Sequence, residues 1–425
     1  MTFETPVEEV MRKLSLAEWE RKYIVGPVER FDQKYTMFNR PVWDPEVTGR
    51  LDDWSFAGEA RERPGYSPWE HALNRASSRA TQLSLFNVHK PNPSAATTAL
   101  MAAMGRGQRQ SRPAAPSGNG HHADVSDAVA VTRNVKKAAR YFGADLVGVC
   151  RLDRRWVYSN SYEGRTFEDS AASGETSGAS RPQDIPEEFQ YAVVMSFDMD
   201  YEMMRRYPSY IADSVTGMGY SRMAIANAHL AAFIRGLGFK TIDCSINDVA
   251  LSVPLALLAG LGDLGRNGLL VTPELGPRLR LSKVLTDMPM EPDAPVDFGV
   301  TEFCQSCRKC ADLCPSQAIS SGQRTTEPQS TSNAAGEMKW PVHAEKCRMY
   351  WSRMKKSCCN CIACCPYSKP DTLFHRTVRR LTDHARWANR LYIRADSLFG
   401  YGRPVKAQDF WEDWQPRRKQ PRLVP

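Results

Sequence analysis

The residues best suited to chemistry are cysteines, and they fall in two groups between Cys304 and Pro366. The first group has the spacing Cys-x2-Cys-x2-Cys-x3-Cys-Pro and ends at Pro315. In this pattern the first three thiolates hold one [4Fe–4S] cluster, and the fourth ligates a second cluster. The first cluster therefore needs one further thiolate, and the second needs three.

The second group supplies these ligands, because Cys347 precedes a Cys-x2-Cys-x3-Cys-Pro run that starts at Cys358. We predict two [4Fe–4S] clusters, each held by four thiolates. The choice within the second run stays open, since Cys359 and Cys364 are neighbours of the chosen residues and Cys361 and Cys364 also form a Cys-x2-Cys pair. The two predicted sets are Cys304, Cys307, Cys310 and Cys365, and Cys314, Cys347, Cys358 and Cys361.

Two other uses of these cysteines are less consistent with the pattern. Zinc can be bound by Cys-x2-Cys pairs, but a tetrahedral zinc site does not require the repeated Cys-x3-Cys-Pro ending. A disulfide framework is not expected either, because a chain of 425 residues can bury a core without cross-links.

The overall composition indicates an ordinary globular protein, with 42% hydrophobic and 24% charged residues. The net charge of +8 is spread along the chain, so we expect no nucleic-acid partner. No apolar run reaches the roughly 18–20 residues that span a bilayer. Residues 1–16 contain neither a twin-arginine pair nor an apolar signal core. The protein is therefore expected to be cytoplasmic, or its export signal is absent from this sequence.

Changes in composition predict four parts. Residues 1–126 form a tryptophan-containing segment that wraps another domain, and this segment ends in an Ala/Gly/Pro-rich linker at 93–126. Residues 127–300 form an α/β core, and residues 301–370 carry the clusters. The basic, aromatic tail at 371–425 is expected to pack back on the body.

Hydrophobic periodicity predicts the elements of the core. Apolar residues recur at intervals of three and four from residue 220 to 237, as on one face of a helix. The segment between the two cysteine groups, 320–337, has few apolar residues and is expected to be a loop. The predicted helices are 8–23, 131–142, 220–237 and 251–261, and the predicted strands are 145–149, 191–198, 240–244 and 278–287.

Two common cofactor motifs are absent from the sequence. No Gly-x-Gly-x-x-Gly opens a βα unit, so a dinucleotide site is not supported. The sequence also lacks an Asp-x-His-x-x-Gly segment that could offer a histidine to a corrinoid cobalt.

Several short segments between about residues 127 and 366 form a specific combination. The segments are Gly219-Tyr220-Ser221 at the expected start of a helix, Asn247-Asp248, Ser252-Val253-Pro254, Ala259-Gly260-Leu261-Gly262, Arg266-Asn267-Gly268, Gly276-Pro277-Arg278, the run from Lys283 to Pro289, the run from Asp297 to Cys304, Trp340, Lys346-Cys347 and Trp351. Together they resemble the cobalamin-dependent reductive dehalogenases of the respiratory type, whereas the cysteine groups alone would fit many ferredoxin-like proteins.

This resemblance implies an α/β (α+β) fold, with a nitroreductase-like cobalamin-binding core and a C-terminal ferredoxin-like domain with two [4Fe–4S] clusters. It also implies base-off cobalamin without a protein ligand to cobalt, reduced through the clusters. By matching motifs, Tyr220 would donate a proton beside Arg266, with Asn247 in the same pocket. A phenol is a weak acid with a pKa of about 10, and a nearby guanidinium favours its ionised form. We further predict that Tyr350 and Trp351 line the substrate cavity, because aromatic walls suit apolar organohalides.

Structural roles for the same residues remain possible. Tyr220 could be a core residue, Arg266 could hold a backbone turn or a cobalamin side chain, and Asn247 could be an ordinary turn residue. A related function, that of epoxyqueuosine reductase acting on tRNA, and a simple electron-transfer subunit are the alternatives. Bound corrinoid would exclude the electron-transfer subunit.

The resemblance also implies a location and partners. The enzyme would lie on the exterior face of the cytoplasmic membrane after twin-arginine export, held by a small integral-membrane anchor protein. Electrons would come from the quinone pool or a reduced carrier, the substrate would be an organohalide, and the chain could form a homodimer.

Overall fold

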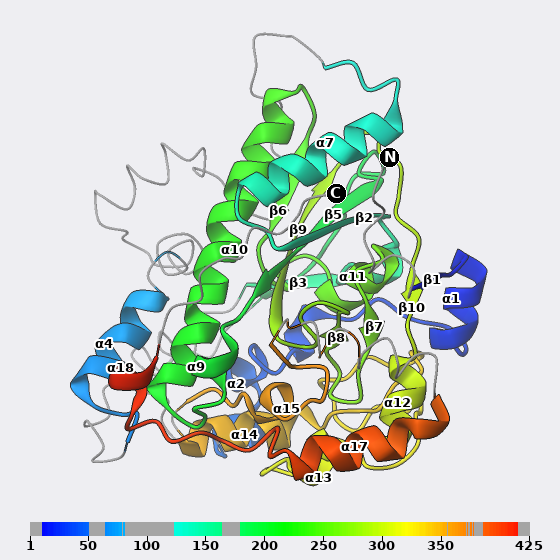
Figure 1. The fold of residues 1–425 in the computed structure, drawn as a ribbon. Helices are drawn as coiled ribbons and strands as arrows, with labels where there is room; N and C mark the ends of the chain where they lie inside the picture. The colour runs from blue at the N-terminus through cyan, green and yellow to red at the C-terminus, as the bar shows by residue number, and fades with distance from the viewer. Residues whose placement is uncertain are drawn as a thin grey trace.

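A computed structural model of the chain describes residues 11–50, 64–78, 80, 123–163, 179–354, 356–370, 372, 375, 377 and 386–414. Its centre is an antiparallel four-stranded sheet with the order β2-β5-β9-β6 (Figure 1). The four predicted strands are confirmed to within two residues at each end. They are β2 (Leu146–Arg151), β5 (Tyr191–Asp198), β6 (Thr241–Cys244) and β9 (Leu279–Thr286).

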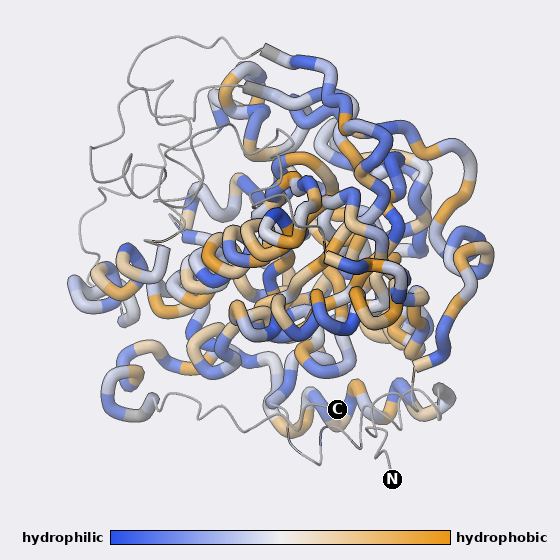
Figure 2. Tube along the Cα trace, turned by 90° about the horizontal axis from the view of Figure 1, so that it is seen from above, coloured by the Kyte–Doolittle hydropathy of each residue, from blue (hydrophilic) through white to orange (hydrophobic). Residues whose placement is uncertain are grey.

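Helices cover both faces of this sheet. On one face α7 (Ala128–Tyr141) and α10 (Tyr210–Gly236) bury a core against β5 and β9. On the other face α11 (Ser252–Leu258) packs with α1 (Leu16–Tyr23), where the Trp19 and Trp156 rings meet edge to face. Apolar residues gather in these central elements, and hydrophilic residues lie toward the periphery (Figure 2). The predicted α+β core is confirmed.

Helix α10 begins ten residues before the predicted start, so Tyr220 lies in its middle rather than at its first turn. Ser209 caps the helix by accepting a hydrogen bond from the Ala212 amide at 3.3 Å. The first half of α10 is buried on several sides because α4 (Pro68–Ser77) and α9 (Tyr201–Met204) pack against it. No polar stripe therefore marked it as helix in the sequence.

The N-terminal segment contacts both the core and the cluster region. Residues 11–15 are not helical, because β1 (Arg12–Lys13) pairs with β10 (Val296–Asp297) and a capping box of Ser15 and Glu18 then starts α1. Arg40 forms an ion pair with Glu345 beside the cysteine groups. The short elements here are the 3₁₀ helix η2 (Gln33–Tyr35), α2 (Arg40–Trp43) and α3 (Pro45–Thr48).

The cysteine region consists of short helices and loops at the lower edge of the molecule as drawn in Figure 1. The predicted loop at 320–337 is confirmed, with isolated bridges in place of strands. The helices are α12 (Val300–Ser306), α13 (Lys309–Asp312), α14 (Ala344–Met354) and α15 (Asn360–Ala363).

The remaining elements are small. Within the described tail, the Trp411 indole of α18 donates to Glu70 of α4 at 2.7 Å, so this part contacts the body. Most of the predicted linker at 93–126 lies outside the described residues, as do residues 1–10 and 415–425. In the described part, no helix is long and apolar enough to cross a bilayer. The further elements are β3 (Asn160–Glu163), β4 (Ala179–Pro182), β7 (Asp263–Leu264), β8 (Leu270–Val271), η4 (Arg154–Trp156), η5 (Arg386–Ala388), α17 (Asn389–Leu398) and α18 (Phe410–Asp413).

Candidate functional site

The side chains of Tyr220 and Arg280 meet between α10 and β9. One terminal guanidinium nitrogen of Arg280 lies 3.5 Å from the phenol oxygen of Tyr220, and the guanidinium lies over the ring at 4.8 Å. Both residues are half-buried. The pair therefore combines a proton donor with a fixed positive charge, which is the arrangement predicted for acid catalysis, with a different arginine.

Arg280 is oriented by the helix that carries the tyrosine. Its second terminal nitrogen donates to Thr216 Oγ1 at 3.1 Å, and Thr216 lies one turn before Tyr220. At Gly219, an added Cβ would lie 2.9 Å from Cγ of Arg280, so glycine permits the arginine to lie close against α10. The guanidinium is thus held between two side chains of one helix face.

Arg266 does not lie beside the tyrosine hydroxyl as predicted; its guanidinium binds the cluster region. It donates to the carbonyl of Cys304 at 2.8 and 3.1 Å, and to the carbonyls of Ser320 and Gly322 at 2.8 and 3.0 Å. It also lies 4.6 Å from the centre of the Trp340 ring. The turn between β7 and β8 directs Arg266 to these carbonyls, so its observed role is to join the core to the cysteine segment.

Asn247 lies in the loop after β6, and its side chain is engaged in a local turn. Its Oδ1 accepts hydrogen bonds from the amide and hydroxyl of Ser252 at 2.9 and 2.8 Å. Ser252 Oγ in turn accepts from the buried Lys283 ammonium at 3.1 Å. These contacts fix the start of α11, and the predicted place of Asn247 in the same pocket as Tyr220 stays a prediction.

Three cysteines of the first predicted set share one apolar cluster, and the fourth, Cys310, packs against the neighbouring one. Cys304, Cys307 and Cys365 pack together around Phe303 and Tyr367. Burial, followed by the neighbouring Cys365 and Cys304 thiols, raises the pKa of Cys310. These four sulfurs thus lie within electrostatic range of one another, as one cluster site requires.

The second predicted set also gathers. Burial and then Cys314 raise the pKa of Cys347 to about 11. Burial raises the pKa of Cys358 to about 11, and both Cys347 and Cys314 contribute. Cys361 packs in the same apolar cluster as Cys314 and Cys347.

In the sequence, Cys359 and Cys364 left open which cysteines of the second group bind iron. Cys359 points toward α10, with its sulfur 3.9 Å from both the Thr216 hydroxyl and the Ala212 carbonyl. Burial raises its pKa to about 12, and Cys358 and Arg280 are among the charged groups that influence it. This orientation favours Cys358 over Cys359 as a ligand. Cys364 is fully buried beside Cys365 and stays a possible alternative.

The described residues contain no group of three or more His, Cys, Asp or Glu side chains that could hold a single metal ion. A [4Fe–4S] cube places its four thiolates around a larger body than one ion, so the two gathered sets suit such a cube. Backbone amides support this use, since the Ala318 amide donates to the Cys314 sulfur at 3.4 Å. The donor sets therefore fit the predicted clusters.

The surroundings of the second cysteine set also fit a large polar cofactor. Cys358 and Cys314 influence the raised pKa of Tyr350, after burial, which places this tyrosine beside the set. The ring of the adjacent Trp351 lies 6.3 Å from that of Phe38. Among the described side chains, Trp351 Nε1 and Arg280 Nε are buried donors without a hydrogen-bond partner. Such donors suit the amide groups that surround a corrin ring, and the substrate contacts of Tyr350 and Trp351 stay predictions.

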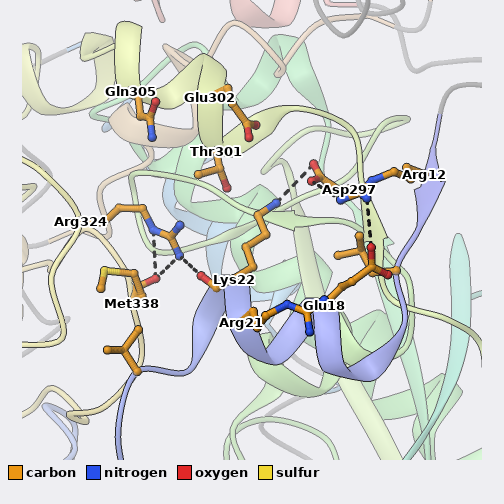
Figure 3. A pocket seen from close by; sticks show the side chains of 12 residues that line it. Arg12, Glu18, Arg21, Lys22, Asp297, Thr301, Glu302, Gln305, Arg324 and Met338 are labelled. Carbon is orange, nitrogen blue, oxygen red and sulfur yellow. Dashed lines mark hydrogen bonds and ion pairs between the residues drawn. The ribbon is translucent and has the colours of Figure 1, made fainter.

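A separate pocket of about 610 Å³ lies between α1 and α12. Its lining is largely charged, and Lys22 bridges to Asp297 at 3.3 Å there (Figure 3). Arg324 donates to the carbonyls of Met338 and Lys22 at its edge (Figure 3). None of the predicted site residues lines this pocket.

Sequence reasoning missed Arg280 and Thr216. Arg280 lies on the same face of β9 as Ser282 and Val284, and Val284 belongs to the core beneath α10. The period of two in a strand could therefore have directed Arg280 toward the helix that carries Tyr220. Thr216 precedes Tyr220 by four residues, but this relation requires the helix to extend further back than the sequence indicated.

Two long matches to known proteins are to reductive dehalogenases. No protein-family model matches the chain. The chain is 40% identical over 306 residues to a tetrachloroethene reductive dehalogenase of Sulfurospirillum multivorans, which covers 68% of this chain and 60% of that protein. A solved reductive dehalogenase, described as suggesting a mechanism for B12-dependent dehalogenation, matches with a TM-score of 0.69 and 24% identity, over 96% of this chain and 51% of that one.

A shorter match links the chain to a second group. It is 34% identical over 119 residues to an epoxyqueuosine reductase of Lactococcus garvieae, which covers 28% of this chain and 32% of that protein. The chain thus spans about three fifths of the Sulfurospirillum multivorans relative and about half of the solved dehalogenase.

Proposed function

We propose that this chain is a member of the reductive dehalogenase family and that it replaces a halogen by hydrogen, or eliminates vicinal halides, in an organohalide. In replacement, two electrons and one proton convert the carbon–halogen bond to a carbon–hydrogen bond and release halide. The proton is the part of this balance that the chain's own side chains can supply.

One observation carries the proposal: the Tyr220–Arg280 pair lies next to the second cysteine set. Cys359 connects the two, since it follows Cys358 directly and its sulfur lies 3.9 Å from the hydroxyl of Thr216, which also binds Arg280. A proton donor thus lies close to the place from which electrons would arrive. In this proposal Tyr220 donates the proton, and Arg280 stabilises the phenolate that remains.

The same geometry supports a proposal for the cofactors. We infer that the two cysteine sets hold two [4Fe–4S] clusters and that cobalamin binds base-off between the second set and the Tyr220–Arg280 pair. Bound cobalamin would supply the cobalt centre at which the carbon–halogen bond is reduced. Arg280 Nε and Trp351 Nε1 are available to hold its amide side chains, and Tyr350 and Trp351 would enclose the substrate.

The remaining parts of the proposal concern organisation and partners. The cobalamin-binding part would extend over residues 127–300 and the cluster-binding part over 301–370, with 1–126 and 371–425 packed around them. The enzyme would act at the exterior face of the cytoplasmic membrane, with a small anchor protein and an electron donor from the quinone pool or a reduced carrier.

The alternative is an enzyme that resembles epoxyqueuosine reductase and acts on tRNA. It is supported by the shorter match alone, which covers 28% of this chain. The dehalogenase proposal is favoured because its match covers 68% of the chain. A tRNA substrate would also need a basic surface, whereas the net charge of +8 is spread along the chain.

Halide release tests the proposal. The chain is reconstituted without oxygen with iron, sulfide and cobalamin, reduced with a viologen dye, and incubated with chlorinated ethenes, ethanes, phenols and benzenes. We expect halide release from at least one class, with eight iron atoms and one cobalt per chain. A fully loaded protein that releases no halide from any class would refute the proposal, and turnover of an epoxyqueuosine stem-loop would establish the alternative.

A further inference from the structure

Helix α17 turns apolar side chains away from the protein. Trp387, in the turn η5 that leads directly into α17, and Leu391 and Leu398 of α17 are 86%, 63% and 85% exposed. They follow one another at intervals of four and seven residues, as on one side of a helix. Arg390 and Arg394 are exposed beside them on the same side of the helix. The outward surface of α17 is defined here as these five residues. Large apolar side chains gathered in this way indicate a binding surface rather than scattered exposure.

The opposite side of α17 is fixed to the first cysteine set. Ile393 packs against the apolar cluster that contains Cys304, Cys307 and Cys365. Asp396 forms ion pairs with Lys309 at 2.5 Å and Lys369 at 2.7 Å. Lys309 lies between two cysteines of the first group. Helix α17 thus lies beside α12 and α13, which carry Cys304 and Cys310 of the first set (Figure 1).

We propose that the outward surface of α17 binds the surface of an anionic lipid bilayer. Trp and Leu side chains enter the interface between headgroups and acyl chains, and nearby Arg side chains bind anionic headgroups. Helix α17 has 10 residues, so it can lie in the plane of the membrane but cannot cross it. The arrangement suits contact with a lipid surface in which apolar and negatively charged groups lie side by side.

Charge argues against a second copy of the chain as the occupant. In a two-fold symmetric contact the same surface meets itself, so the positive charges of Arg390 and Arg394 from both copies would be brought into one interface. Like charges brought together in this way weaken association. Anionic lipid instead offers the complementary charge.

If α17 contacts the membrane, electrons would enter at the first cluster and pass to the second; this step rests on the proposed function. The first cysteine set lies beneath α17, and the second set lies near Cys359 and Arg280. An electron donor in the membrane would therefore meet the first cluster, while the Tyr220–Arg280 pair lies beyond the second.

Vesicle binding by the cofactor-loaded chain tests the proposal. Sedimentation is measured with vesicles of phosphatidylglycerol and phosphatidylcholine, and with phosphatidylcholine alone, at low and high salt. We expect binding to the anionic vesicles that weakens with salt. Joint replacement Arg390→Gln and Arg394→Gln should weaken it about fivefold for each charge. Joint replacement Trp387→Ser, Leu391→Ser and Leu398→Ser should weaken it at least about tenfold.

A matched control uses exposed side chains on another helix. Val129 and Tyr141 of α7 are 61% and 87% exposed, and α7 lies at the opposite end of the molecule from α17 (Figure 1). The joint replacement Val129→Ser and Tyr141→Ser should leave vesicle binding unchanged. An equal loss in this control, or no binding of the unmodified chain at low salt, would overturn the proposal.

Two further measurements separate the possible occupants and functions. If the unmodified chain dimerises and the triple serine variant is monomeric, without any vesicle binding, the surface belongs to a second copy and the lipid proposal is wrong. Halide release driven by a soluble viologen should be equal in the unmodified and triple variants. A loss of lipid binding with normal turnover therefore tests α17 alone, whereas a failure of turnover in both proteins concerns the proposed function.

Discussion

Replacement of Tyr220 by phenylalanine should remove turnover and leave the fold intact. The substitution deletes one hydroxyl and keeps the ring, which lies under the Arg280 guanidinium at 4.8 Å. The hydroxyl's contact with Arg280 is 3.5 Å long, at the outer limit of a hydrogen bond. Its loss should change the free energy of unfolding by no more than about 1 kcal/mol.

The effect on catalysis should be much larger. A positioned general acid contributes roughly 10²–10⁴-fold to the rate. A hundredfold loss corresponds to about 2.7 kcal/mol in the activation free energy, since each tenfold change is about 1.36 kcal/mol. The predicted losses of stability and activity therefore differ enough to separate a catalytic role of Tyr220 from a core role.

The assay is halide release in a single turnover, with iron, cobalt and thermal unfolding measured on the same preparation. Tyr141→Phe is the matched control, because this tyrosine is 87% exposed on α7 and its replacement should change none of these quantities. Arg280→Lys should also lower the rate, because one ammonium cannot contact both Thr216 and Tyr220 as the planar fork does. Near-normal halide release by Tyr220→Phe with full cofactor content would refute the catalytic assignment and show that Tyr220 has only a packing role.

Three further predictions test the remaining geometry. Arg266→Gln should lower the free energy of unfolding by about 2–3 kcal/mol and reduce the iron content, because it removes charged hydrogen bonds to buried carbonyls. A variant with unchanged stability in denaturant titration and full iron content would contradict this. Cys358→Ser should lose the second cluster, whereas Cys359→Ser should keep eight iron atoms; iron analysis with the opposite result would exchange their roles. Gly276→Ala should lower the melting temperature more than Gly143→Ala. Both glycines have positive φ, but only at Gly276 would the added Cβ lie 2.4 Å from a backbone carbonyl oxygen of the cluster region. Equal melting temperatures of the two variants would argue against this contact.

The sequence by itself determined the features that depend on local spacing. Cysteine ligands from one short run must follow a fixed spacing, so Cys304, Cys307 and Cys310 could be assigned to one set without a structure. Runs of alternating or continuous apolar residues predicted all four strands of the central sheet. The segment likeness to the reductive dehalogenases also named the family that the comparisons support.

Tertiary structure decided which distant side chains meet. Arg266 and Arg280 are both arginines near glycines in the sequence, yet the β7–β8 turn sends the first to the Cys304 carbonyl and β9 sends the second to Tyr220. The first half of α10 likewise showed no helical stripe, because neighbouring elements bury it on several sides. Which arginine accompanies the phenol depends on how β9 packs under α10, and this packing brings together residues 60 positions apart. Such a relation has no local signature in the chain, whereas the spacing of ligands around one cluster does.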